Sequence, residues 1–242
     1  MRLPATSDWD ALQTAAHAWQ VDPDDIDART LELRCTAWLS PEERTRLDRL
    51  PNDRLKHVYL TSRALCRGTL SRYTDVDPAA WTFVANAHGK PAIAAPVEFE
   101  TLRFNLTHSE GLLACLVTRA GQVGVDVEET SRGVDADRIA HHFFSAAEQA
   151  CLTALGPEQR RGRFFEYWVV KEAYLKGCAT GLSRSPDQFT VQFDEDGQPS
   201  AIDRWQLTLH RPTPRHVAAT AVWRQPDIVA VPVTWRVYEG LL

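Results

Sequence analysis

One stretch constrains the fold more than any other: the run from Glu158 to Gly177 has the apolar spacing of a long helix. Its end reads W-V-V-K-E-A-Y-L-K, at 168–176. Glu172 and Lys176 are four residues apart, so they lie on one face of that helix, with Lys171 beside them. Such a pair alone is most often a solvated surface ion pair. Two other stretches, at 104–109 and 124–128, favour a functional interpretation.

The composition is typical of a cytoplasmic globular protein. The chain has 242 residues, 44% of them apolar and 24% charged, which suits one large domain or two small ones. Its net charge of -5 gives no field that recruits nucleic acid. No apolar run is long enough to span a membrane, and Asp8-Trp9-Asp10 stands where a signal peptide is apolar. The five scattered cysteines form no C-x-x-C pair or zinc cluster, so we predict reduced thiols.

Helix and strand patterns alternate in the first 120 residues. Met1–Arg29 has no clear period and is predicted to be a loosely packed lead-in. Thr30–Leu39 alternates apolar and polar residues like a half-buried strand. Ser40-Pro41-Glu42-Glu43 is typical of a helix start with a capping box. A long helix is predicted over Asn52–Tyr73, and strands over Trp81–Ala85, Leu102–Thr107 and Leu112–Thr118.

The rest of the chain repeats this order of elements. Ser145 and Glu148 form a second capping-box pattern. The predicted helices are Ala136–His142, one starting at Ser145, and Glu158–Gly177; the predicted strands are Gln122–Glu128, Gln188–Phe193, Trp205–Arg211, Val217–Trp223 and Val233–Tyr238. Short turns between strands favour antiparallel pairing. We therefore predict an α+β fold in which each half packs helices on a small antiparallel sheet.

Asp126 and Glu128 are two residues apart in a predicted strand, so their side chains point to one face. Neighbouring carboxylates repel each other, and Val123, Val125 and Val127 around them are apolar. A hard divalent cation, which prefers oxygen ligands, resolves that conflict. A solvated strand edge explains the same pattern, and this motif alone does not decide between the two interpretations.

Glu172 can supply a third carboxylate from the long helix. Mg²⁺ takes only a few protein oxygens and leaves the others to water and a substrate phosphate. Cationic groups are then expected around that phosphate. The candidates are Arg63, Lys90, His108, Lys171 and Lys176. Each residue alone is weak evidence for phosphate binding, since single cations and histidines are usually solvated or structural. We assign such a structural role to His141 and His142.

Five short motifs occur in a fixed order: G-K-P at 89–91, F-N-L-T-H-S at 104–109, G-V-D-V-E at 124–128, F-F-S-x-x-E at 143–148 and W-x-x-K-E-A-x-x-K at 168–176. Together they resemble the 4'-phosphopantetheinyl transferase superfamily, and the chain length is similar to its Sfp-type branch. The resemblance covers Ser40 to Ser183. It implies two pseudo-symmetric α+β halves, predicted at 1–120 and 121–242, with the active site and the coenzyme A cleft between them.

The resemblance implies roles for the carboxylates and lysines of the second half. Asp126, Glu128 and Glu172 match the family's Mg²⁺ ligands, and Mn²⁺ is a possible substitute. Lys171 and Lys176 match basic residues that face the pyrophosphate of coenzyme A.

The coenzyme A contacts implied in the first half are Lys90, Thr107 and His108, mainly to phosphates. Arg63 resembles a helix arginine that contacts the 3'-phosphate in some members. Glu148 matches a family glutamate, but its capping box already explains it, so we leave it off the catalytic residues.

The implied reaction moves 4'-phosphopantetheine from coenzyme A to a serine hydroxyl of an apo acyl, peptidyl or aryl carrier protein. Adenosine 3',5'-bisphosphate is released. Phosphoryl transfer depends mostly on positioning and charge neutralisation. Glu172, or a metal-bound water that it orients, is predicted to take the serine proton, and Lys176 to stabilise or protonate the leaving phosphate. We expect a cytoplasmic monomer that binds no nucleic acid and no membrane.

Three residues depart from the family pattern. Thr107 stands where most members have serine and keeps the hydroxyl, Val127 offers no ligand between Asp126 and Glu128, and Val169 replaces a small residue. Two other functions fit parts of the pattern: a non-catalytic module that binds coenzyme A or a carrier domain, and a metal-dependent nucleotide hydrolase that needs no acceptor. The complete set of carboxylates with Lys176 argues against the module.

Overall fold

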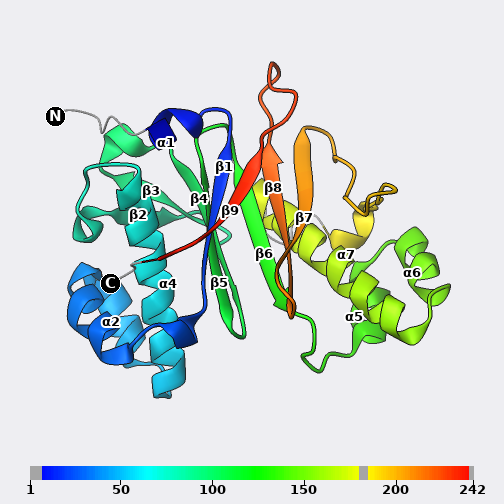
Figure 1. Ribbon diagram of the computed structural model, residues 1–242, viewed down its shortest axis with the longest axis horizontal. Coiled ribbons are helices and arrows are strands. Elements are labelled where there is room, and N and C mark those ends of the chain that lie inside the picture. The colour runs from blue at the N-terminus through cyan, green and yellow to red at the C-terminus, as the bar shows by residue number, and fades with distance from the viewer. Residues whose placement is uncertain (1–6, 180–184, 240–242) are drawn as a thin grey trace.

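Helices flank two sheets on both outer sides in the computed structural model, which describes residues 7–179 and 185–239 (Figure 1). Helix α7 begins at Pro157, a residue well suited to the first helical position, and ends before Ala179, whose backbone is left-handed with φ of 56°. The α-helices are α1 (Ser7–Ala11), α2 (Ala28–Cys35), α3 (Pro41–Asp48), α4 (Asp53–Arg72), α5 (Ala136–Phe143), α6 (Ala146–Thr153) and α7 (Pro157–Cys178).

The strands form two main sheets and one hairpin. The first sheet has the order β4-β5-β1-β9, the second has the order β6-β8-β7, and β2 pairs with β3. All pairs are antiparallel except β1 with β9, which are parallel. The strands are β1 (Ala16–Val21), β2 (Thr82–Ala85), β3 (Pro91–Ala95), β4 (Arg103–Ser109), β5 (Leu112–Thr118), β6 (Val123–Glu129), β7 (Trp205–Thr213), β8 (His216–Trp223) and β9 (Val233–Val237).

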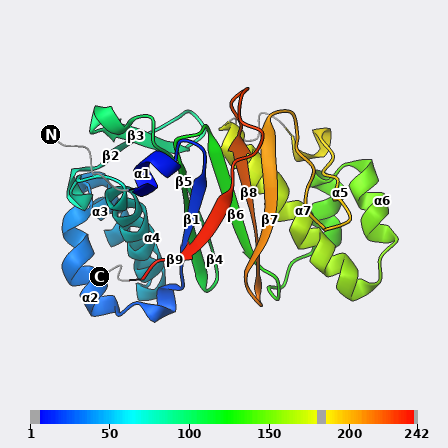
Figure 2. The ribbon, with the colours of Figure 1, turned by 45° about the horizontal axis from the view of Figure 1, so that its top comes forward.

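The two halves share part of their hydrophobic core. Each half has its own cluster of buried aromatic and aliphatic side chains, one against α4 and one against α7. A third cluster of small apolar residues joins β1 and β5 to β6 and β8, and includes Ala18, Leu116, Val125 and Val222. Strand β9 lies beside β1 although it follows the second sheet in the chain (Figure 2). The last strand of the 121–242 half therefore completes the sheet of the first half.

The predicted α+β fold class is confirmed, and most predicted elements are present. The long helices α4 and α7, the strands β4 to β8 and the short helix α5 lie within a few residues of their predicted bounds. Both capping boxes form: Ser40 with Glu43, and Ser145 with Glu148. No helix in the described ranges is long and apolar enough to cross a membrane.

The predicted strand at Thr30–Leu39 is wrong, because this segment is helical. Helix α2 spans Ala28–Cys35, and a short 3-10 helix follows at Thr36–Trp38. The Asp27 carboxylate caps the helix by accepting the Thr30 N–H. Leu31 and Cys35 are buried and four residues apart, a spacing that fits a helix, whereas Leu33 is 75% exposed.

The predicted loose lead-in at Met1–Arg29 is also wrong for residues 7–29, because they contain β1, an inner strand of the first sheet, while residues 1–6 lie outside the described ranges. This strand pairs with β5 on one side and β9 on the other. His17 breaks its apolar pattern, yet that side chain is buried, and its Nδ1 lies 2.7 Å from the Tyr73 hydroxyl. Polar residues that are satisfied inside a core are invisible to a search for apolar periodicity.

The predicted strand at Gln188–Phe193 is wrong as well. Residues Pro186–Gln188 form a 3-10 helix, and the rest of the segment has only one isolated bridge, from Phe193 to Pro199. Side chains satisfy its backbone instead, since the Val191 N–H donates to Glu148 and the Phe189 carbonyl accepts from Lys171. The buried apolar residues here lie over α7 without forming a ladder.

Candidate active site

Side chains of β4 join the two halves along β6. Asn105, Thr107 and Ser109 alternate along β4 and accept hydrogen bonds from three backbone N–H groups of β6, those of Val125, Val127 and Glu129. The donor–acceptor distances are 2.9, 3.3 and 2.9 Å. The F-N-L-T-H-S motif thus provides a row of acceptors at every second residue. This row fixes the register of β6, and with it the places of Asp126 and Glu128.

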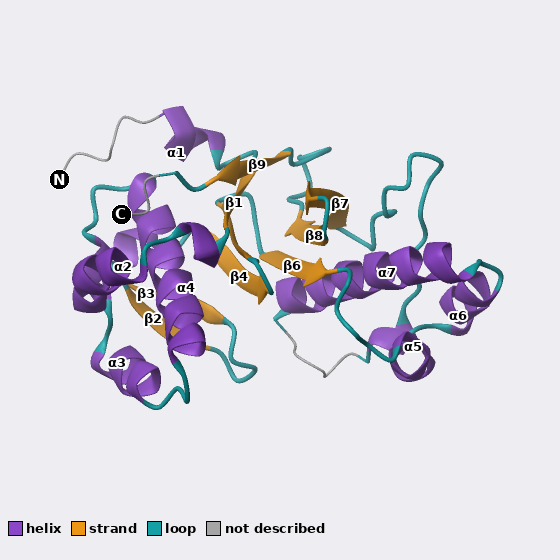
Figure 3. Ribbon diagram, turned by 60° about the horizontal axis from the view of Figure 1, so that its bottom comes forward, coloured by secondary structure: helices purple, strands orange, loops and turns teal. Residues whose placement is uncertain are grey.

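Gly124 allows helix α7 to lie directly on β6. A Cβ at this position would stand 2.0 Å from the Ala173 carbonyl oxygen and 2.3 Å from the Gly177 nitrogen. Both are backbone atoms, so a larger residue would push the helix and the strand apart. Figure 3 shows α7 lying along the second sheet with its C-terminal end at β6. The close approach brings the carboxylates of β6 to the face of α7 that carries Glu172 and Lys176.

Lys176, Asp126 and Thr107 form a connected polar group in this seam. The Lys176 Nζ lies 2.6 Å from Asp126 Oδ1 and 3.3 Å from the Thr107 hydroxyl, which in turn donates to Asp126 at 3.1 Å. Burial acts to lower the pKa of Lys176, but the Asp126, Glu172 and Glu128 carboxylates together raise it. The ammonium is therefore fully charged at neutral pH.

The three carboxylates are close enough to influence one another. Burial and then the charge of Asp126 raise the pKa of Glu128 to about 7, and the same two causes raise the pKa of Glu172. Asp126 is 5% exposed, and its Oδ2 is buried without a hydrogen-bond partner among the described residues. The Asp126 carboxylate therefore pairs with Lys176 through one oxygen, and its other buried oxygen is left to accept from a further partner.

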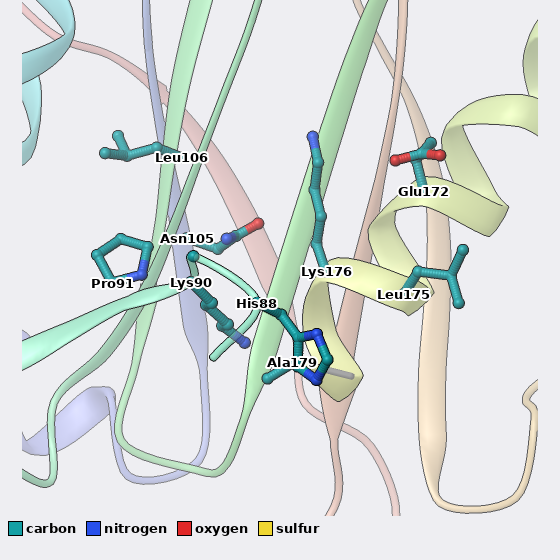
Figure 4. A pocket seen from close by; sticks show the side chains of 10 residues that line it. His88, Lys90, Pro91, Asn105, Leu106, Glu172, Leu175, Lys176 and Ala179 are labelled. Atoms are coloured by element: carbon teal, nitrogen blue, oxygen red, sulfur yellow. The ribbon is translucent and has the colours of Figure 1, made fainter. Parts of the chain in front are cut away.

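A cavity of about 340 Å³ opens beside this group. Figure 4 shows Glu172 and Lys176 projecting from α7, with Lys90 and Pro91 across from them. Lys90 Nζ donates to the carbonyls of Val123 and Gly177, at 2.8 and 2.9 Å, and burial lowers its pKa to about 8. An ammonium has three protons, so one remains for a ligand in the cavity. The lining residues are His88, Gly89, Lys90, Pro91, Asn105, Leu106, Glu172, Leu175, Lys176 and Ala179.

The prediction that Lys171 faces the cleft is wrong. Its side chain is 1% exposed, and its Nζ lies 2.9 Å from the Glu148 carboxylate on the other side of α7. The Nζ also donates to the carbonyls of Pro186 and Phe189, at 2.6 and 2.7 Å. Lys171 and Lys176 are five residues apart, which turns them about 140° from each other around the helix. Lys171 is therefore committed to the interior of the second half.

Two other predicted contacts, His108 and Arg63, are not among the residues that line the cavity. Partial burial and then the charge of Lys176 lower the pKa of His108, which places this imidazole within electrostatic reach of the site. Arg63 lies on α4, 3.7 Å from Glu43 and over the Tyr59 ring. The contacts of both residues with coenzyme A remain predictions.

Three residues of the site were not singled out from the sequence. Asn105 holds β6, Trp168 donates its indole N–H to Glu128 at 3.0 Å, and Arg132 lies 2.9 Å from the same carboxylate. Asn105 and Trp168 both lie inside the recognised motifs. Trp168, Glu172 and Lys176 also recur every four residues, a spacing that predicts one shared face.

Comparison with known proteins identifies the family. The profile of the 4'-phosphopantetheinyl transferase superfamily matches residues 122–223, which include β6 and α7. A 4'-phosphopantetheinyl transferase of Bacillus subtilis is 32% identical over 70% of this chain and 73% of its own length. The chain belongs to the 4'-phosphopantetheinyl transferase superfamily. The 4'-phosphopantetheinyl transferase HetI of Nostoc sp. is 29% identical over 91% of this chain and 92% of its own. The transferase Sfp of Bacillus subtilis is 30% identical over 69% of this chain and 72% of its own length.

The superfamily and enzyme class predicted from the motifs are thereby confirmed. Among solved structures, a holo-(acyl-carrier-protein) synthase from Bacillus anthracis, in complex with coenzyme A (3',5'-ADP), matches 42% of this chain and 93% of its own, at 20% identity. Its TM-score is 0.36, which is too low to compare the two sites residue by residue.

Proposed function

We propose that this transferase moves 4'-phosphopantetheine from coenzyme A to a serine hydroxyl of an apo acyl, peptidyl or aryl carrier protein and releases adenosine 3',5'-bisphosphate. One observation carries the proposal: Asp126 and Glu128 of β6 meet Glu172 and Lys176 of α7 beside a cavity of about 340 Å³. Acidic metal ligands next to a charged ammonium suit the chemistry of a pyrophosphate. The resemblance of the motifs and the curated relatives support the same reaction.

Asp126, Glu128 and Glu172 would hold Mg²⁺, which Mn²⁺ can replace. Within the described ranges no group of three or more His, Cys, Asp or Glu side chains is arranged so that it could hold a metal ion by itself. Mg²⁺ does not require one, since it keeps several positions for water and substrate phosphate. The unpartnered Asp126 Oδ2 and the charge coupling of the three carboxylates fit such an ion. When bound, the ion would offset the negative charge of the pyrophosphate.

Side chains of this protein carry out the proton transfer and stabilise the phosphates. Glu172 has no hydrogen bond or ion pair within residues 7–179 and 185–239, and its raised pKa favours uptake of the serine proton. The serine oxygen forms a bond to the β-phosphorus as the bond from this phosphorus to the bridging oxygen breaks. The electron pair of the broken bond leaves with adenosine 3',5'-bisphosphate. Lys176 donates a hydrogen bond to this leaving phosphate, and the third proton of Lys90 is directed to a phosphate in the cavity.

The physiological setting follows from the same proposal. The enzyme would act as a cytoplasmic monomer. Its partners would be coenzyme A and a carrier protein. Nucleic acid and membranes are not expected to bind.

Intact-mass spectrometry of an apo carrier protein tests the proposal. The carrier is mixed with this chain, coenzyme A and Mg²⁺, and we expect it to gain one phosphopantetheine. Asp126→Ala and Glu172→Ala should abolish the gain. Glu166→Gln is the matched control, because Glu166 lies on α7 but pairs with Arg163 and Arg211 away from the cleft. An unmodified carrier with coenzyme A still bound in calorimetry would instead indicate a binding module, and loss of coenzyme A without any acceptor would indicate a hydrolase.

A further inference from the structure

Trp168 lies between the aromatic core of the second half and the carboxylates of β6. Its indole N–H donates to Glu128 Oε1 at 3.0 Å. Its ring packs edge-on against Phe143, at a centroid distance of 5.8 Å, and is nearly parallel to Phe164, at 6.5 Å. An indole has a single polar atom, so a ring that is fixed on both sides fixes the direction of its N–H.

Both hydrogen bonds to Glu128 reach the same oxygen. Arg132 donates to Oε1 at 2.9 Å, as Trp168 does at 3.0 Å. The Glu128 side chain is only 12% exposed, whereas Arg132 is 40% exposed and follows the end of β6. Among the described residues no hydrogen bond goes to Oε2. The carboxylate is therefore held by one oxygen, and the other is left for a ligand.

Glu172 provides the contrast within the same site. It lies one helical turn after Trp168 on the same face of α7, yet no donor within the described ranges holds its carboxylate. A group that must take up a proton during the reaction needs freedom to move, whereas a metal ligand benefits from a fixed orientation. Of these two proposed metal ligands, Glu128 is held by its neighbours, whereas Glu172, which is also the proposed base, keeps its freedom to move.

We propose that Trp168 is a positioning residue for Glu128: its indole N–H fixes Oε1 so that Oε2 is presented to the divalent cation. This inference rests on the proposed function, because it takes Glu128 as a ligand of the ion. Hydrogen-bond partners of metal ligands typically change metal affinity 10- to 100-fold. Trp168 acts through Glu128 and does not itself touch the substrate or the ion.

Binding of Mn²⁺ without coenzyme A provides a test that does not depend on activity. The free ion is measured by electron paramagnetic resonance during titration of the full chain. Trp168→Phe keeps an aromatic ring and removes the N–H, so we expect affinity to fall about 10- to 100-fold. Replacing Trp168 by 3-benzothienylalanine, in which sulfur takes the place of the N–H, should give the same loss with the ring size unchanged. This second variant keeps the test valid if phenylalanine disturbs the fold.

Phe143→Leu is the matched packing control, because Phe143 touches the Trp168 ring but has no polar atom. Its Mn²⁺ affinity should stay within about twofold of the wild type, since the hydrogen bond to Glu128 is intact. A loss as large as that of Trp168→Phe would show that packing, not the N–H, sets the affinity, and would overturn the proposal.

A double-mutant cycle decides whether Trp168 acts through Glu128. Glu128→Gln alone should weaken Mn²⁺ binding, and adding Trp168→Phe should then cost little more. Additive losses, or an unchanged affinity in Trp168→Phe, would overturn the positioning role. An unchanged affinity in Glu128→Gln would overturn it as well. The transfer of phosphopantetheine by the wild type is measured separately, so a failure of the proposed function is recognised independently.

Activity gives a further distinguishing readout. A positioning role predicts that Trp168→Phe raises the Mn²⁺ concentration needed for half-maximal transfer about 10- to 100-fold, with kcat recovered when the ion is saturating. A fall in kcat that saturating Mn²⁺ does not recover would contradict a role in metal binding alone.

Discussion

Two lysines of one helix show how differently this molecule uses the same side chain. Lys171 is 1% exposed, and its ammonium meets the Glu148 carboxylate and two backbone carbonyls. Glu148 is equally committed, since it also accepts the N–H groups of Ser145 and Val191. Every strong polar group in this network has a partner. Such a network holds α6, α7 and the segment after Ser185 together, and it has no capacity left for a ligand.

The network around Lys176 is open instead. Lys176 is about one third exposed and meets one oxygen of Asp126, while the second oxygen has no partner in the part of the chain that the structure describes. Glu128, which Arg132 partly balances, and Glu172 add negative charge beyond what the Lys176 ammonium neutralises. A closed buried network indicates a structural role, and an open one beside a cavity indicates a ligand. The comparison separates two lysines that the sequence motif presents as equivalent.

Lys171→Met should break the closed network and produce the largest effect. It leaves the Glu148 carboxylate buried without its counter-charge, so the free energy of unfolding should fall by about 3–5 kcal/mol. Urea denaturation measures this change. Adding Glu148→Gln should recover part of the loss, because no unpaired charge remains. If Lys171→Met kept its stability but bound coenzyme A weakly, Lys171 would belong to the cleft after all.

Lys176→Met should act on chemistry more than on stability. Loss of one electrostatic group that stabilises a leaving phosphate typically slows the reaction by about 10²–10³. Its side chain is more exposed than that of Lys171, so the free energy of unfolding should fall less. Mg²⁺ should restore that smaller loss by neutralising the carboxylates, whereas it should not help Lys171→Met. Single-turnover mass spectrometry and denaturation with and without Mg²⁺ check both points, and a transfer rate close to the wild type would contradict the open-network interpretation.

Local spacing was enough to predict the components of the cleft. Asp126 and Glu128 share a face because a strand repeats every two residues, and Glu172 and Lys176 do so because a helix nearly repeats every four. The structure brings all four together. The assignment of Lys171 failed because its direction depends on where β6 and the segment 185–191 lie relative to α7, and no local spacing contains that information.

The same limit explains the fold errors. Strand β1 contains His17, whose polar ring is satisfied by Tyr73 at the C-terminal cap of α4, so its burial depends on a partner 56 residues away. Helix α2 resembles a strand in sequence because Leu31 and Cys35 fit both periods, and only the Asp27 cap and the exposed Leu33 distinguish the two. Long periodic elements are predictable from the sequence, whereas elements defined by distant partners are not.

The open network should also make the free energy of unfolding depend on pH, an effect smaller than those of the two lysine substitutions. Burial and the charge of Asp126 raise the pKa of Glu128 from its ordinary value of 4.5 to about 7. Between these two values the folded protein holds a proton that the unfolded chain has released, so stability falls as pH rises through this window. The expected loss, without a divalent cation, is on the order of 2 kcal/mol.

Urea denaturation across that pH window measures the effect, with Glu128→Gln as the control. The variant has no titrating carboxyl at this position, so its stability should fall less steeply with pH than that of the wild type. Mg²⁺ binds the ionised carboxylate, and its affinity for the wild type should therefore increase as pH rises toward 7. Parallel stability curves for the two proteins would mean that Glu128 ionises normally. The repulsion among the carboxylates, on which the open network depends, would then be too weak to attract a cation.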